Sequence, residues 1–380
     1  MFLVERLFGT SLYVGILLVT CYLIYRTQKR STKFIMGLYL LSISIMAFLY
    51  VPAVEADLYR LIESMQNYAS LSSGDFIAAL SDTPVSMVYF RLIGMTGLTG
   101  LLAGVTSLIV FGNIFYIIYD YSKKLYASNK VNALTLFMIM SSGLYMSAIS
   151  GIRNMLAFSI LTRCFYDEIC NDKKLWKNIV WYLLACLIHP AAVGVVIIRL
   201  IVLIQDKVSK GKIRSLITTI ISLTLGVLML FYVGGTVYLV SAVEKLTSYA
   251  DGAGYTYFWD NVMTLLTLLF IVLNYRLFSS YHYLHKNNKL NSLIKLSYIF
   301  TVFSMLFFFD HTIFVRFTHF NFLIMIPVIM SNFSYIINAT KKTTIKLRFS
   351  HRLIFYIPFI IFIISISRGS LSSLKFFVLG

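Results

Sequence analysis

Four arginines have the residue type and the placement to bind an anionic substrate at a membrane surface: Arg60, Arg91, Arg153 and Arg316. The guanidinium group binds phosphate and carboxylate through a planar fork of donors, and it stays charged when partly buried. Arg153 and Arg316 stand at the ends of otherwise apolar segments. The loop charges described below predict that all four lie on the outer side, so we expect an anionic, lipid-linked substrate there.

Arg153 and Asn154 open a predicted helix directly after an apolar run that ends at Ile149. The first turn of a helix offers free backbone donors and the positive end of the helix dipole, and both favour a bound anion. We therefore predict that Arg153 and Asn154 bind the phosphates of the substrate. The alternative is that Arg153 snorkels to lipid headgroups.

The dipeptide His189-Pro190 interrupts another apolar stretch. Proline frees backbone groups, and irregular backbone is tolerated at membrane depth only where protein or a water-filled cavity lines it. His189 would face that cavity, where it could donate to a phosphate or take a proton. The alternative is a neutral histidine that caps a broken helix.

Arg316 and His319 are three positions apart and would share one helical face at an outer helix junction. We predict that they contribute to the same anion site. The alternative is that Asp310 and Arg316 form an ion pair that joins two helices. The nearby histidines match no standard metal-binding spacing, so we expect no metal site.

Asp57 and Arg60 lie in the first long loop between apolar runs. A carboxylate such as Asp57 could deprotonate an incoming sugar hydroxyl, and the alternative is a solvated loop face. Arg60 and Arg91 are candidates for a further anion contact, with simple anchoring at the interface as the competing role.

The composition is that of a membrane protein, because 59% of the 380 residues are hydrophobic and only 13% are charged. The net charge of +18 sits mainly in short loops between apolar runs, as membrane insertion requires, so we expect no nucleic-acid binding. The chain has no nucleotide-binding motif, so we expect no cofactor and a reaction driven by an activated substrate or a gradient. The four cysteines form no metal-type pair and are expected to be free thiols.

Apolar runs long enough to cross a bilayer as helices predict an all-α polytopic membrane protein with about twelve spans. The predicted spans are 8–25, 34–51, 98–119, 131–149, 152–170, 177–189, 190–204, 213–233, 259–278, 292–309, 317–338 and 353–368. The short pair at 177–189 and 190–204 could equally be one broken, re-entrant element. A further short helix is expected at 85–97.

Loop charges predict the orientation, because basic loops stay on the inner side of the membrane. The basic loops lie around 26–33, 123–130, 173–177, 207–214, 286–289 and 341–352, and they alternate with acidic or neutral ones. We expect one integral membrane domain over 1–380 with both termini outside. The outer loops would be 52–97, with short amphipathic helices that form a lid, and 234–258.

Five elements in this order resemble the EpsG/Wzy-like family of bacterial polysaccharide polymerases. They are Asp57-Leu58-Tyr59, the segment from Pro84 to Arg91, Gly151-Ile152-Arg153-Asn154, His189-Pro190, and Arg316-Phe317-Thr318-His319-Phe320. Gly-Ile-Arg-Asn followed by His-Pro at this distance is the most specific part.

The resemblance implies a glycosyltransferase with a GT-C type of fold at the outer face of the bacterial plasma membrane. Its substrates would be lipid-linked oligosaccharide repeat units, as donor and acceptor, carried on undecaprenyl pyrophosphate. The product would be an O-antigen, capsule or exopolysaccharide, and a chain-length regulator would be a partner. The competing hypotheses are a transporter or flippase for lipid-linked sugars, and a ligase for the finished polysaccharide.

Overall fold

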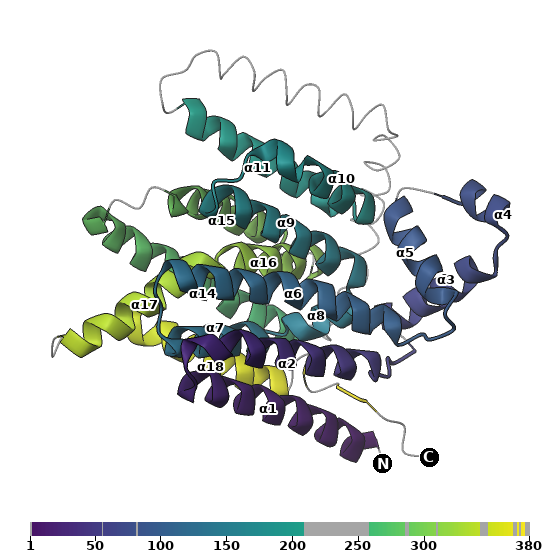
Figure 1. The fold of residues 1–380 in the computed structure, drawn as a ribbon, viewed down its shortest axis with the longest axis horizontal. Coiled ribbons are helices and arrows are strands. Elements are labelled where there is room, and N and C mark those ends of the chain that lie inside the picture. Colours follow the sequence, from purple (N-terminus) through teal and green to yellow (C-terminus); the bar gives the residue numbers. More distant parts are fainter. Residues whose placement is uncertain are drawn as a thin grey trace.

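The computed structural model describes residues 2–54, 56–80, 83–208, 258–285, 289–308, 311–342, 349–367, 371 and 374–376. Within these ranges every regular element is a helix, which confirms the all-α class (Figure 1). The predicted span at 213–233 lies outside the described residues, as does all but the last residue of the predicted outer loop at 234–258.

The helices fall into three groups along the chain. The N-terminal third contains α1 (Phe2–Arg26), α2 (Lys29–Phe48), α3 (Asp57–Ser70), α4 (Ser73–Ala78), α5 (Pro84–Gly94) and α6 (Leu101–Lys124). The middle contains α7 (Asn129–Ser141), α8 (Leu144–Ser150), α9 (Ile152–Cys170), η1 (Leu175–Asn178), α10 (Ile179–Ile188) and α11 (Ala191–Val208). The C-terminal part contains α14 (Phe258–His285), α15 (Leu290–Leu306), α16 (His311–Ile324), α17 (Ile326–Lys342) and α18 (Phe349–Ser367).

The number of membrane spans differs from the prediction of about twelve. In the described part of the chain, α1, α2, α6 and α14 contain 4 stretches long and apolar enough to cross a membrane, or up to 6 if the bent pairs α7–α8 and α16–α17 each count as one. The helix α9 is not among these stretches, because it contains four charged residues: Arg153, Arg163, Asp167 and Glu168. The higher count is therefore not confirmed.

Two predicted spans are bent helix pairs. The stretch expected at 131–149 divides into α7 and α8, which meet at 53°, and the stretch at 317–338 divides into α16 and α17, which meet at 55°. Gly143, between α7 and α8, has φ +79°, a left-handed conformation that glycine adopts without the cost a Cβ would bring. Pro327, at the start of α17, has no N–H to continue the hydrogen bonds of α16.

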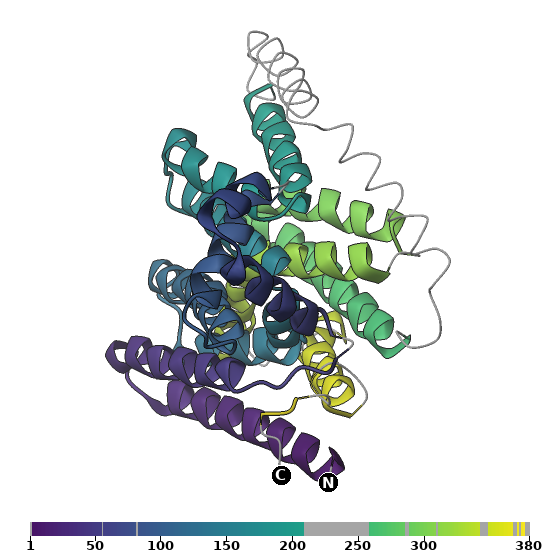
Figure 2. The same cartoon turned by 90° about the vertical axis from the view of Figure 1, so that its right-hand side faces the viewer.

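The helices stack in layers that begin with the hairpin of α1 and α2. α1 packs on α7 and α2 packs on α6, and α6 in turn packs on α9, as Figures 1 and 2 show. The far side of α9 is covered by α10, while α16 lies between α9 and α15. This order places α9 in the interior of the bundle, with packing partners on several sides.

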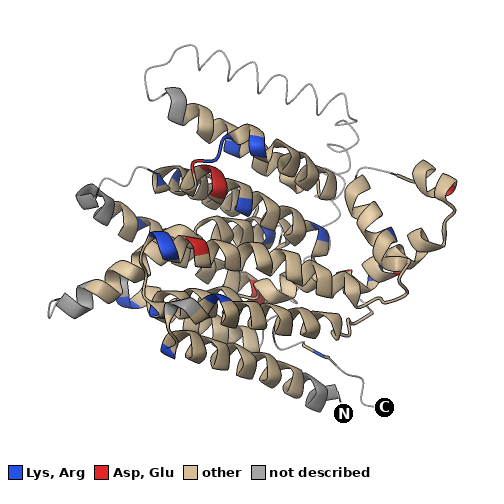
Figure 3. Cartoon of the chain, viewed as in Figure 1, with Lys and Arg blue, Asp and Glu red and all other residues tan. Residues whose placement is uncertain are grey.

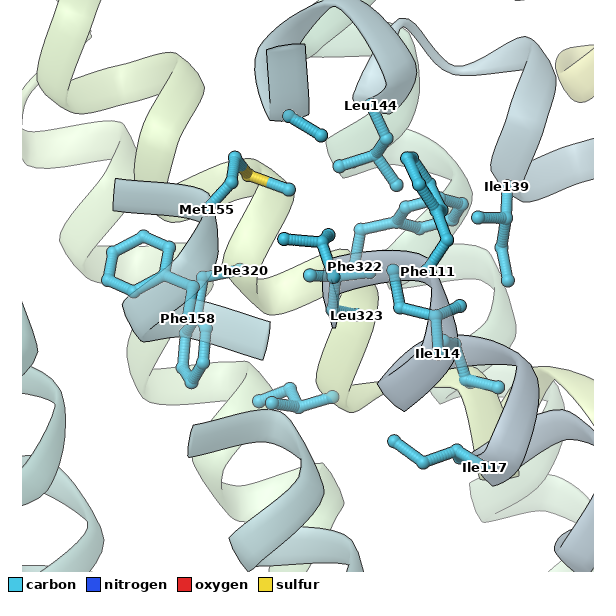
Figure 4. Packing of buried hydrophobic residues seen from close by; sticks show 14 of the residues in the cluster. Phe111, Ile114, Ile117, Ile139, Leu144, Met155, Phe158, Phe320, Phe322 and Leu323 are labelled. Atoms are coloured by element: carbon cyan, nitrogen blue, oxygen red, sulfur yellow. The ribbon is translucent and has the colours of Figure 1, made fainter. Parts of the chain in front are cut away.

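Aromatic rings fill the space between α9 and α16. Figure 4 shows the ring of Phe158 beside that of Phe320, and their centroids are 4.8 Å apart. The ring of Phe158 also lies 6.0 Å from that of Phe317, and Phe165 lies 5.9 Å from Phe320. Further along both helices, Thr162 on α9 lines the same small cavity as Leu323 on α16. The two helices run in the same direction, so their N-terminal ends lie at the same end of the bundle.

Several basic loops meet at the opposite end of the bundle. The ammonium group of Lys124 donates to the carbonyl oxygen of Cys170 at 3.1 Å, and Lys289 forms an ion pair with Asp172. Asn129 also donates to the carbonyl oxygen of Thr27. These contacts bring four loops that were predicted to share the inner side to one end of the helices, where Figure 3 shows much of the Lys and Arg.

Candidate functional site

The candidate site lies where the junction of α8 and α9 meets α16. Ser147 on α8 and His319 on α16 are joined by a contact of 3.1 Å between Oγ and Nδ1. One turn further along, Gly151 separates α8 from α9, and its N–H donates to the carbonyl oxygen of Ser147 at 2.9 Å. The two segments that the sequence marked around residues 150 and 316 are therefore in contact.

Arg153 lies in the first turn of α9 and is partly buried. Across the described ranges, no residue forms a hydrogen bond or an ion pair with its guanidinium group. A positive side chain at a helix N-terminus is unfavourable unless an anion joins it, because the helix dipole is positive at that end. The surroundings of Arg153 therefore favour an anionic ligand.

Asn154 follows Arg153 and is 5% exposed. Its Oδ1 atom is buried and has no hydrogen-bond partner among the residues that the structure describes. Helical spacing puts Asn154 one turn before Phe158, on the side of α9 that packs against α16. An unsatisfied buried amide costs about 1–3 kcal/mol, so a ligand that supplied a partner would be stabilised here.

The helix α16 carries Arg316 and His319. Arg316 is partly buried and directly precedes Phe317, which packs against Phe158. His319 is buried and held by Ser147, while Nδ1 of His311 lies 2.7 Å from Oδ1 of Asn261 on α14. The alternative role for Arg316, an ion pair with Asp310, involves a residue outside the described ranges.

His189 occupies the break between α10 and α11. The backbone N–H of Ala191 donates to its Nδ1 atom at 3.1 Å, so the histidine caps the start of α11. A neutral imidazole that accepts at Nδ1 carries its proton on Nε2. The predicted break at His189-Pro190 is confirmed, since α10 ends at Ile188 and α11 begins at Ala191. Neutral His189 presents a donor at Nε2 rather than the lone pair that a base needs.

In the segment α3–α5, which was predicted to lie on the outer side, the charged candidate residues bind one another or backbone carbonyl oxygens. Asp57 and Arg60 pair with each other on α3, with both side chains exposed. Arg91 on α5 donates to the carbonyl oxygens of Leu71 at 3.1 Å and Ser72 at 3.4 Å, and its guanidinium lies 4.4 Å from the ring centroid of Phe76. Arg91 thus supports the turn after α3, and nothing in this geometry favours it as a phosphate contact.

Two features, one at the site and one at the other end of α9, were not anticipated. Ser147 and Asn261 hold the histidines of α16, but single polar residues in apolar runs give no sign of what they contact. The second feature is a buried ion pair between Glu168 and Arg199 at the other end of α9. Ionisable residues inside apolar stretches usually have a function, and that signal was present in the sequence.

In the part of the chain described, no group of three His, Cys, Asp or Glu could hold a metal ion.

The long apolar helices define the chain as a multi-pass helical membrane protein. The chain belongs to the EpsG family, whose family model matches residues 98–377. The matched part includes Arg153, His189 and Arg316 and begins after Asp57, Arg60 and Arg91. No curated protein and no solved structure matches the chain significantly.

Proposed function

We propose that the chain is a membrane glycosyltransferase that polymerises oligosaccharide repeat units linked to undecaprenyl pyrophosphate, at the outer face of the bacterial plasma membrane. Membership of the EpsG family, which is associated with glycosyltransferase-like polymerases, supports this class of activity. The observation that supports the site best is Arg153, which has no protein partner among the described residues, lies in the first turn of α9 and is followed by the unsatisfied Asn154.

The donor's pyrophosphate binds to Arg153 and Arg316. Attack by an acceptor hydroxyl breaks the bond between the anomeric carbon and the phosphate oxygen, and the lipid pyrophosphate leaves with that electron pair. Charge grows on the leaving group, so fixed cations stabilise the transition state more than the ground state. Asn154 and His319 complete the binding surface around the phosphates.

The acceptor hydroxyl loses its proton as the new glycosidic bond forms. Of the two candidates for the base, Asp57 has the carboxylate lone pairs, while neutral His189 presents Nε2–H and suits a contact to a phosphate oxygen. Arg60, next to Asp57 on α3, is then the candidate contact for the acceptor's pyrophosphate. The activated donor drives the reaction without a nucleotide.

The direct test is polymerisation of purified lipid-linked repeats by the variants Arg153→Ala and Arg316→Ala. Loss of an electrostatic contact in the transition state lowers kcat by about 100-fold or more. Lys123→Ala is the matched control, because it removes one positive charge from the opposite end of the bundle. Wild-type rates and chain lengths in both arginine variants, with the proteins folded, would refute the proposal.

Product analysis separates this activity from its competitors. Longer lipid-linked chains identify a polymerase, and transfer of finished chains to another acceptor identifies a ligase. Movement of the lipid-linked sugar across a vesicle membrane without any new bond identifies a flippase.

A further inference from the structure

The carboxylate of Glu168, near the C-terminal end of α9, accepts hydrogen bonds from three side chains of the segment that follows α9. Arg199 on α11 donates from Nη2 at 3.1 Å and from Nε at 3.3 Å to Oε2. Tyr182 on α10 donates to Oε1 at 2.6 Å, and Asn178 donates to the same atom at 3.1 Å. The side chains of Arg199 and Glu168 are only 3% and 4% exposed.

A buried ion pair contributes little net free energy to the packing of two helices. Apolar side chains of similar volume often serve equally well, because the two charges must be taken out of water. Here Nη1 of Arg199 is also buried without a partner among the described residues, which adds to the cost. The ion pair adds geometric specificity. A guanidinium that donates two hydrogen bonds to one carboxylate fixes both the distance between the two side chains and their relative orientation.

The partners of Glu168 all belong to the segment that contains the break at His189. Asn178 and Tyr182 precede the break and Arg199 follows it. One carboxylate therefore accepts hydrogen bonds from residues on both sides of the break. The helix that provides this carboxylate also carries Arg153, 15 positions away, or roughly 22 Å at the helical rise.

We infer that Glu168, through Arg199, is a positioning residue that sets the α10–α11 pair against α9 and so fixes His189 relative to Arg153. This inference rests on the proposed function for its effect on catalysis, and on the buried contacts for its effect on structure. A displacement of about 1 Å at a group that contacts the leaving phosphate, as proposed for His189, can cost about 100-fold in rate. Loosening the pair therefore lowers kcat while leaving the phosphate contacts of Arg153, and hence KM, nearly unchanged.

The neighbouring Asp167 is a matched control on the same helix turn. It also pairs with two cations, Arg163 at 3.2 Å and Lys173 at 2.8 Å, but these come from α9 itself and the loop that follows. Replacing Asp167 by Asn removes one carboxylate charge at the same end of α9 without touching the contacts to α10 and α11.

The experiment compares Glu168→Gln, Arg199→Gln, the exchanged pair Glu168→Arg with Arg199→Glu, and Asp167→Asn in the full chain in lipid discs. One readout is kcat and KM for polymerisation. The other is the distance distribution between nitroxide labels at exposed Leu183 on α10 and Leu108 on α6, in a cysteine-free background. The label distance reports the position of α10 whether or not the chain is a polymerase.

We expect each single variant to lower kcat by about tenfold or more, to leave KM within about twofold and to shift or broaden the label distance. The exchanged pair keeps the ion pair but leaves Tyr182 and Asn178 without a carboxylate to donate to, so it should bring both readouts part of the way back to the wild-type values. Asp167→Asn should change neither readout. Unchanged distances in both single variants would overturn the inference, whatever the rates. If neither single variant folds, an exchanged pair that also fails to fold would overturn it, because the ion pair would then not be what holds the helices. A wild-type chain that makes no polymer would instead refute the proposed function.

Discussion

Oγ of Ser147 and Nδ1 of His319 lie 3.1 Å apart although 172 positions separate the two residues in the chain. The contact joins α8 to α16 immediately beside the start of α9, where Arg153 lies. It is a direct polar connection between the two motif regions, and its removal is the first of four predictions.

Ser147→Ala should lower polymerisation about fivefold, because a hydrogen bond contributes about 1 kcal/mol and His319 would lose its orientation. Initial rates of the purified variant on lipid-linked repeats give the measurement. The control is Ser142→Ala, since the hydroxyl of Ser142 bonds to the carbonyl oxygen of Ile139 in its own helix turn and not to another segment. Equal rates for the two variants would mean that the contact does not matter for the site.

Phe158→Ala should destabilise the protein by about 3 kcal/mol, because truncating a buried phenylalanine leaves a cavity that the core fills only in part. The lost ring contacts are those to Phe317 and Phe320 between α9 and α16. Unfolding in mixed detergent micelles measures the change. Phe34→Ala, at a side chain that is 68% exposed, should have a much smaller effect.

Gly9→Ala should displace the C-terminal segment from α1. A Cβ at Gly9 would lie 2.5 Å from the carbonyl oxygen of Leu374, which real Cβ atoms do not tolerate. Thr10 and Val51 also bind this segment, through the carbonyl oxygens of Leu371 and Lys375. Faster cleavage of the C-terminus by carboxypeptidase is the expected result. Gly15→Ala is the control, because a Cβ there would have no heavy atom of another segment within 4 Å, and resistance equal to wild type in both would contradict the contact.

Arg91→Ala should weaken the α3–α5 segment more than it weakens substrate binding, because the donors of Arg91 bind the carbonyl oxygens of Leu71 and Ser72. Limited proteolysis between residues 57 and 94 should become faster, and KM should stay within about twofold, the size of a few tenths of a kcal/mol. Arg91→Lys, which cannot reproduce the fork geometry, should show an intermediate effect. A large rise in KM with unchanged proteolysis would return Arg91 to the substrate site.

The helices with strong apolar runs were predictable from local sequence. The spans predicted at 8–25 and 34–51 appear in the structure as α1 and α2, and the short helix predicted at 85–97 appears as α5. The bends at Gly143 and before Pro327 were not predicted, although glycine and proline are the usual signs of such breaks. The apolar pattern continued across both bends, and hydropathy alone does not register a change of direction.

The sequence by itself determined that this chain is a helical membrane protein with basic loops on one side, because a membrane helix satisfies its backbone hydrogen bonds within its own segment. Composition over about 20 residues is therefore enough to mark a span. Only the tertiary structure decided that Ser147 holds His319, that His189 caps α11 and that Glu168 binds Arg199. Such contacts depend on how each helix is rotated about its axis, and packing against neighbouring helices sets that rotation.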